Sequence, residues 1–276
     1  MLFNGVGIPG MTGLRFSVFA VAFSVTACLA QSNAVPAADD CGEVMTIETH
    51  DRTTTRYALA RTQGAPDQDA RIALVLLVGG GGNLNLSGKG CPMSLSGNVL
   101  IRMRPLIHGA GFATALVDAP SDSFGGDGLA GFRIAPQHAD DLGKVISDVR
   151  ALTNGSVWLV GHSRGTISAA NAAARLSGPA APDGLVLMSA MMSGDARAKK
   201  AFVAQTVFDL PLEAIKMPVL VVGHAADSCV RSPAGLMDNI TARTQGAREQ
   251  IATVTGGPSN PGRAPSLSAC EGPRAA

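Results

Sequence analysis

The sequence GHSRG at residues 161–165 places Ser163 between two glycines in a G-x-S-x-G pattern. The pattern alone is a weak signal, so the flanking residues decide its meaning. An apolar run over residues 157–160 precedes it, and a helix-compatible run over residues 166–176 follows it. In a strand–turn–helix context the glycines allow a sharp turn that exposes the serine hydroxyl as a nucleophile. We therefore take Ser163 as a candidate nucleophile, the alternative being an incidental serine in a glycine-rich turn.

Four consecutive glycines at residues 79–82 directly follow an apolar run over residues 72–78. Without a Cβ, the backbone N–H groups of glycine can approach a ligand closely, and such groups are suited to hold an oxyanion. A phosphate-binding loop is one alternative, but the pattern G-x-x-x-x-G-K-[ST] is absent because Gly90 follows Lys89. A plain flexible loop is the other alternative.

The apolar and helix-compatible runs alternate along the chain, which is typical of βαβ units and a parallel sheet. Two polar–apolar alternating segments, residues 43–49 and 55–59, come first and suggest an antiparallel hairpin. Apolar runs expected to be strands covered on both faces lie at residues 72–78, 113–117, 157–160, 185–188 and 219–222, with a final strand at residues 250–254. The helix-like segments lie at residues 97–109, 138–152, 166–177 and 195–206.

This order of elements, with GHSRG after the third parallel strand, resembles the α/β-hydrolase superfamily over roughly residues 43–270. It is most similar to small exported bacterial members without a large lid. The resemblance implies an α/β-hydrolase fold: a mostly parallel central sheet, helices on both faces and antiparallel N-terminal strands. It also implies hydrolysis of an ester or related acyl bond in a small-molecule substrate, with no cofactor and no metal.

The resemblance assigns roles to residues on the loops that follow the strands. The oxyanion donors would be the N–H groups of Arg164 and Gly81, with Gly80 next, on a loop similar to the family's H-G-G-G segment with Gly79 in place of His. Asp227, after the expected strand at residues 219–222, would be the acid that orients the base. A loop-capping role is the alternative for this aspartate.

The base is the missing component, because the family places its histidine after the acid. The five histidines are at positions 50, 108, 138, 162 and 224, and none follows Asp227. By resemblance, a histidine and a last helix should come shortly after Cys270. Three interpretations stay open: a chain cut short relative to an active hydrolase, His224 as a substitute base, or a non-catalytic protein that binds an acyl ligand. We expect weak or no turnover.

Other polar residues are expected to be structural. His162 packs away from the nucleophile, and His138 caps or solvates the start of a helix. His50 and His108 are expected at or near the surface. Arg133, in the loop over residues 119–137, could bind a substrate carboxylate, but a surface ion pair is the expected use.

Composition allows one large core, since 46% of the 276 residues are hydrophobic and 16% are charged. The net charge of +1 gives no reason to expect a nucleic acid or an acidic membrane as partner. Residues 1–30 are expected to be an export signal, with either a cleavage site at residues 28–30 or a lipobox that lipidates Cys28. We expect an exported protein, periplasmic, secreted or an outer-membrane lipoprotein. Residues 31–42 would be a linker and residues 43–276 a single, C-terminally incomplete domain.

Export would place the four remaining cysteines in an oxidising compartment, where three pairings are available to them. No C-x-x-C spacing points to a metal site. The family resemblance favours a Cys229–Cys270 bond, because it would tie the C-terminal segment beside Asp227. Cys41–Cys91 is then the second bond.

Overall fold

The computed structural model describes residues 41–61, 71–246, 248–256, Ser266 and Cys270. The expected export signal and most of the expected linker lie outside the described residues. Four α-helices are described: α1 (Val99–Gly109), α2 (Pro136–Thr153), α3 (Gly165–Arg175) and the short α4 (Asp238–Thr241). The eight strands are β1 (Glu43–Glu48), β2 (Thr54–Ala60), β3 (Ile72–Leu77), β4 (Ala113–Val117), β5 (Ser156–His162), β6 (Gly184–Met188), β7 (Val219–His224) and β8 (Glu249–Val254).

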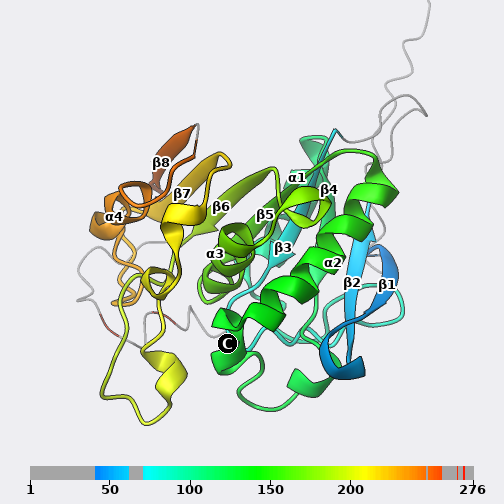
Figure 1. Ribbon diagram of the computed structural model, residues 1–276, viewed down its shortest axis with the longest axis horizontal. Coiled ribbons are helices and arrows are strands. Elements are labelled where there is room, and N and C mark those ends of the chain that lie inside the picture. The colour runs from blue at the N-terminus through cyan, green and yellow to red at the C-terminus, as the bar shows by residue number, and fades with distance from the viewer. Residues whose placement is uncertain (1–40, 62–70, 247, 257–265, 267–269, 271–276) are drawn as a thin grey trace, which may run out of the picture. The chain divides into compact units, whose positions relative to one another are not determined.

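All eight strands belong to one sheet with the order β1-β2-β4-β3-β5-β6-β7-β8. β1 and β2 pair antiparallel, β2 pairs antiparallel with β4, and the strands from β4 to β8 run parallel (Figure 1). The parallel strands are apolar in sequence, as is typical of a parallel sheet with helices packed on its faces. The loops that follow β3, β5 and β7 therefore meet at one edge of the sheet, where ligands bind in open α/β folds.

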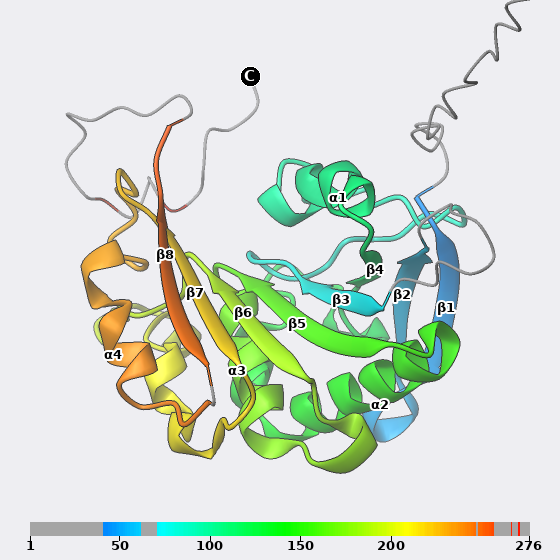
Figure 2. The ribbon, with the colours of Figure 1, turned by 90° about the horizontal axis from the view of Figure 1, so that it is seen from above.

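Two hydrophobic cores lie on opposite faces of the sheet. The larger core packs α2, α3 and α4 against alternate strand residues such as Val75, Leu159, Leu187 and Val221, all fully buried. The smaller core packs α1 against Leu76, Leu116 and Val160 on the other face. Figure 2 shows α1 over β3 and β4, with α2 and α3 beneath the sheet.

The face that carries α1 is only partly covered. Within the described part of the chain, no helix lies over β5 to β8 on this side (Figure 2). Trp158, Leu220 and Val222 point to this face, since they alternate with buried residues of the larger core, and each stays partly exposed. An apolar strip of a parallel sheet thus remains in partial contact with solvent.

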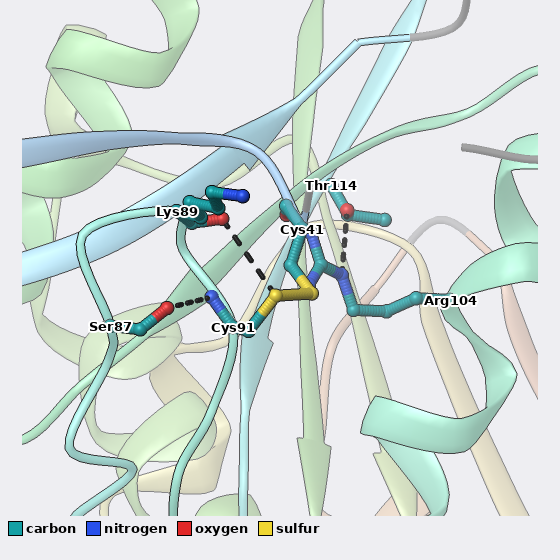
Figure 3. The surroundings of a disulfide bond; sticks show 6 residues. All are labelled: Cys41, Ser87, Lys89, Cys91, Arg104 and Thr114. Carbon is teal, nitrogen blue, oxygen red and sulfur yellow. Dashed lines mark hydrogen bonds between the residues drawn. A yellow bond between two sulfur atoms is a disulfide. The ribbon is translucent and has the colours of Figure 1, made fainter. Parts of the chain in front are cut away.

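The structure contains two disulfide bonds, Cys41–Cys91 and Cys229–Cys270, which are the pairings favoured in the sequence analysis. The first joins the start of β1 to the loop that follows β3 (Figure 3). Arg104 of α1, 6% exposed, donates hydrogen bonds to Cys41 O and Thr114 Oγ1 beside it. The second bond ties Cys270 to Cys229, which lies two residues after Asp227.

The expected helix over residues 195–206 was wrong. This segment consists of turns and a single 3-10 turn, Ala201–Val203. Arg231 joins the two ends of this segment by donating to Ser193 O, just before it (2.6 Å), and to Gln205 O (3.0 Å). A helix over residues 195–206 would hold its two ends roughly 16 Å apart. Asp195 N instead donates to Val203 O (3.3 Å), and Arg231 bonds to both ends, so these tertiary contacts override the helix-compatible composition. No helix in the described part of the chain is long and apolar enough to span a bilayer.

The partly open sheet face can be tested with Trp158, the only tryptophan of the chain. We expect acrylamide to quench its fluorescence clearly in the native protein, because its ring lies on the strip that no described helix covers. The comparison is the same protein unfolded in urea. A native signal that resists quenching would show that another part of the protein covers the strip.

Candidate active site

Ser163 lies at the turn between β5 and α3 with a left-handed backbone, φ 54°. Its N–H donates to Met188 O of the neighbouring strand (3.0 Å), and its carbonyl accepts from Thr166 N and Thr166 Oγ1. A non-glycine residue in this region is strained, and the strain persists because surrounding bonds fix the backbone. Ser163 Oγ makes no hydrogen bond within the described part of the chain.

The two glycines of GHSRG are required by close backbone packing. A β-carbon added at Gly161 would lie 2.6 Å from Gly165 O, and one added at Gly165 would lie 2.0 Å from Leu77 O. Both distances are far below van der Waals contact. A side chain at Gly161 would push the start of α3 away from β5, and one at Gly165 would push it away from β3. The turn expected from the sequence is therefore a tight one.

The glycine loop at residues 79–82 faces this turn. A β-carbon added at Gly79 would lie 2.8 Å from Ser163 Cβ and 3.2 Å from Ser163 Oγ, so any side chain there would cover the hydroxyl. Gly80 and Gly82 have positive φ (59° and 82°), and Gly82 N donates to Gly79 O. The N–H groups of Gly80, Gly81 and Arg164 donate to no other group among the described residues. Three unpaired donors therefore lie on the two segments that meet at Ser163.

Two buried charged side chains hold the glycine loop. Arg133 donates to Val78 O (3.3 Å) and Gly80 O (3.2 Å). Just after the glycine loop, the buried carboxylate of Asp118 accepts from Leu84 N (2.6 Å) and Leu86 N (3.0 Å). Sequence analysis did not single out Asp118, although an acidic residue directly after an apolar strand was visible.

The expectation for Arg133 was wrong, because its side chain forms no surface ion pair and does not reach solvent. It is 1% exposed and also donates to Ser168 Oγ of α3 (2.8 Å). Its backbone carbonyl accepts from Asn171 Nδ2, which fixes the loop that carries it. Burial, with a smaller contribution from Arg164, lowers the pKa of Arg133 to about 9, so it remains charged at pH 7.

Asp227 follows β7 and turns its carboxylate toward its own loop. Oδ1 accepts from Cys229 N (2.9 Å) and Oδ2 accepts from Ser232 Oγ (2.8 Å). This is the loop-capping arrangement that was the alternative for this residue. β7 is separated from β5 by β6 in the sheet, and Asp227 acts electrostatically on His162 beside Ser163. The carboxylate is thus near the turn but committed to local bonds.

His224, the proposed substitute base, has both ring nitrogens in hydrogen bonds. Nδ1 accepts from Ala226 N (3.0 Å), and Nε2 lies 2.9 Å from Gly256 O. Because a carbonyl can only accept, Nε2 is the donor of this bond, while Nδ1 accepts from the backbone. Neither nitrogen has a free lone pair in this arrangement, and no contact joins this ring to Ser163.

His162 lies next to Ser163 in sequence but bonds to α1. Its Nδ1 lies 3.3 Å from Asn98 Nδ2, whose side-chain oxygen caps α1 through Leu100 N. Burial lowers the pKa of His162 to about 4, against a smaller opposing effect of Asp227. The ring is neutral at pH 7 and joins the turn to the start of α1, as a structural residue would.

The remaining histidines lie away from Ser163, and His138 differs from expectation. It is 4% exposed rather than solvated, with Nε2 2.9 Å from Ser168 Oγ. His50 bonds to Asp141 and Asp122. Burial alone would lower the pKa of His50, but these hydrogen bonds outweigh it and raise the pKa. His108 bonds to Thr114.

The rim of the turn carries both charge and apolar surface. The Arg164 guanidinium lies 4.3 Å from the centroid of the Phe202 ring, and Lys200 pairs with Asp127 of the loop that covers Gly81. The partly exposed apolar side chain of Leu95 lies against the loop, because a β-carbon added at Gly80 would lie 3.4 Å from Leu95 Cδ2. No group of three His, Cys, Asp or Glu side chains among the described residues is arranged to hold a metal ion.

The structure thus brings Ser163 together with the glycine loop, while it leaves the hydroxyl without a basic partner. An arrangement of this kind can present a nucleophile and hold a negative oxygen. Transfer of the serine proton would need a base from elsewhere.

Stability should fall in acid because of His138. Burial lowers the pKa of His138 to about 3, whereas an unfolded histidine titrates near 6.5. Between these values the unfolded chain binds a proton that the folded chain does not. Above pH 6.5 His138 does not lower the free energy of unfolding. As the pH falls below this value the free energy of unfolding decreases, by about 2 kcal/mol at pH 5.

This prediction is checked by urea unfolding of the wild type and His138→Gln at pH 7 and pH 5. His162 acts in the same direction in both proteins, so the difference between them isolates His138. Equal losses of unfolding free energy in both proteins would contradict the assignment.

Neither a protein-family model nor a curated protein sequence matches the chain. Solved structures do match. Est1E from Butyrivibrio proteoclasticus, determined with ferulic acid bound, is 16% identical with a TM-score of 0.55, covering 77% of this chain and 89% of its own. A soluble variant of monoglyceride lipase from Saccharomyces cerevisiae, in complex with a substrate analog, is 12% identical with a TM-score of 0.56, covering 80% and 88%.

Dienelactone hydrolase from Anabaena variabilis is 15% identical with a TM-score of 0.51, and the match covers 78% of this chain and 87% of that one. At such identities the likeness concerns the fold. The strand order, the strand–turn–helix at Ser163 and these neighbours agree with one another. The chain has the α/β-hydrolase fold.

Proposed function

We propose that Ser163 is the nucleophile of a site that hydrolyses an ester or related acyl bond. One observation carries the proposal: a strained serine whose hydroxyl has no hydrogen bond among the described residues faces a glycine loop in which the N–H groups of Gly80 and Gly81 are likewise unpaired. A strained backbone at this half-buried serine costs free energy, and strain of this kind is often found at active sites. Free donors beside it are the component that acyl transfer needs most.

In the proposed reaction, Ser163 Oγ adds to the carbonyl carbon of the substrate and loses its proton to a base from solution, water or imidazole, whose conjugate acid later protonates the departing alcohol oxygen. The carbonyl electrons move onto the oxygen, and the N–H groups of Arg164 and Gly81, with Gly80 beside them, stabilise that oxyanion. Collapse of the tetrahedral intermediate expels the alcohol and leaves an acyl-serine, which water then hydrolyses. The apolar side chain of Leu95, beside Gly80, favours an apolar acyl group.

The base is the weak step of this mechanism. The five histidines all lie among the described residues, and none has a hydrogen bond to Ser163 Oγ. Asp227 would orient an imidazolium, which no histidine of the chain provides in this arrangement. Loss of one member of a triad removes several orders of magnitude in rate and leaves residual catalysis from the oxyanion donors. We therefore expect slow turnover.

A non-catalytic role is the second candidate, favoured by the engagement of the Asp227 carboxylate in its own loop. Such a protein would bind an acyl ligand in the same place without chemistry. Saturable binding of a short-chain ester that survives Ser163→Ala, with no turnover, distinguishes this case.

We also propose that the protein is exported. The two disulfide bonds support this, since such bonds persist in oxidising compartments. The expected signal and the lipobox at Cys28 belong to this proposal. The intact mass of the protein from the membrane fraction tests lipidation of Cys28.

The central test supplies the missing base from solution. Purified protein is treated with a fluorophosphonate with and without millimolar imidazole, and Ser163→Ala is the control. We expect slow labelling at Ser163 that imidazole accelerates roughly tenfold or more, since a general base contributes about 10²–10⁴-fold when positioned. Absence of labelling of the folded protein in both conditions would exclude the hydrolase.

His224 should not contribute to the reactivity of Ser163. Because both ring nitrogens are bonded, His224→Gln is expected to leave the labelling rate within about twofold of the wild type, whereas Ser163→Ala abolishes it. A tenfold loss in His224→Gln, with unchanged thermal unfolding, would restore His224 as the base.

A further inference from the structure

Arg133 is a buried cation that is bonded to the backbone of the glycine loop. It lies on the 3-10 helix Ala130–Ile134, and its guanidinium joins this helix to Ser168 of α3 and to the carbonyls of Val78 and Gly80. No carboxylate lies within ion-pair distance of it among the described residues, and its Nε has no hydrogen-bond partner there. A buried charge without a counter-charge is costly and calls for an explanation.

The bond to Gly80 O reaches the peptide unit that matters for the proposed chemistry. The carbonyl of Gly80 and the N–H of Gly81 belong to one planar peptide group, in which they point in opposite directions. Fixing the Gly80 oxygen from behind therefore aims the Gly81 N–H away from Arg133. This N–H is unpaired among the described residues and is the first-choice oxyanion donor.

The charge of Arg133 also polarises that peptide. A cationic donor on a carbonyl strengthens the hydrogen bond that the N–H of the same peptide can donate, because bonds in a chain polarise one another. In the buried surroundings of Arg133 the positive charge is weakly screened. A negative oxygen held by Gly81 would be the counter-charge that the ground state lacks.

We propose that Arg133 is a positioning residue for the oxyanion: it orients and polarises the Gly80–Gly81 peptide and stabilises negative charge that forms during acyl transfer. This inference rests on the proposed function. Arg133 touches no substrate and acts through the peptide. Its charge matters in the transition state more than in ground-state binding, because only there is the oxygen negative.

A purely structural role is the alternative, and packing makes it a serious one. A β-carbon added at Gly82 would lie 2.8 Å from Arg133 Nη2, so the side chain fills space beneath the loop. Loss of that packing would disturb ligand binding and stability together. The experiment must therefore separate binding from the charge-forming step.

The test measures fluorophosphonate labelling of Ser163 with imidazole as added base, over a range of reagent concentrations. This yields the reagent's binding constant and the maximal labelling rate separately. For Arg133→Met, of similar length without charge or donors, we expect the maximal rate to fall at least tenfold with the binding constant within about twofold. Arg133→Lys keeps the charge without the paired donors and should fall between Arg133→Met and the wild type.

Arg104→Met is the matched control, since Arg104 is also buried and also donates to a backbone carbonyl, that of Cys41, away from the glycine loop. It should lower thermal stability and leave the maximal labelling rate unchanged. If Arg133→Met does not fold, Arg133→Lys decides the question.

Equal maximal rates in the Arg133 variants and the wild type would overturn the inference alone. So would a weaker binding constant with an unchanged maximal rate. Absence of Ser163 labelling in the wild type, even with imidazole, would instead overturn the proposed function and this inference with it.

Discussion

The close contact between α3 and β3 is the constraint on which the site depends. The missing β-carbon of Gly165 lets its backbone approach Leu77 O, and this brings the turn at Ser163 against the first residue of the glycine loop. With Gly79 also lacking a side chain, the hydroxyl is uncovered. A bulkier residue at any of these positions would disturb the approach of Ser163 to the glycine loop, whose Gly80 and Gly81 N–H groups are unpaired in the described part of the chain.

Around this contact the protein distributes buried charge unevenly. The Asp118 carboxylate accepts hydrogen bonds from backbone N–H groups just after the glycine loop. Arg133, which bonds to the loop itself, has no carboxylate within ion-pair distance among the described residues. His138 stays neutral and shares Ser168 with Arg133. Arg133 thus bonds to the glycine loop and supplies positive potential there. This is consistent with the proposed oxyanion site, whereas no described base bonds to Ser163 Oγ.

The fold could be predicted from the sequence because apolar runs and turn residues are local signals. Each expected strand is present within about two residues of its expected position, as are α1, α2 and α3. The helix expected over residues 195–206 does not form, because Arg231, far along the chain, bonds to both ends of the segment and the two ends lie together. Composition carries no record of such a contact.

Part of the candidate site was predictable for the same reason, because GHSRG and the four glycines are contiguous motifs. The structure brings Ser163 and Arg164 together with Gly79. Arg133 and His138 carry polar side chains, which suggested the surface. Their burial depends on Ser168 and on loop carbonyls distant in sequence, and nothing local to either residue reveals those partners.

The most direct test of the account is whether Ser163 and its surrounding donors form a tetrahedral adduct. Phenylboronic acid forms a four-coordinate anionic boron when a serine adds to it and donors hold its oxygen, and ¹¹B NMR distinguishes this from the free three-coordinate acid. The account predicts a four-coordinate signal with the wild type that Ser163→Ala abolishes. Three-coordinate boron alone at saturating protein, or an unchanged signal in Ser163→Ala, would contradict it.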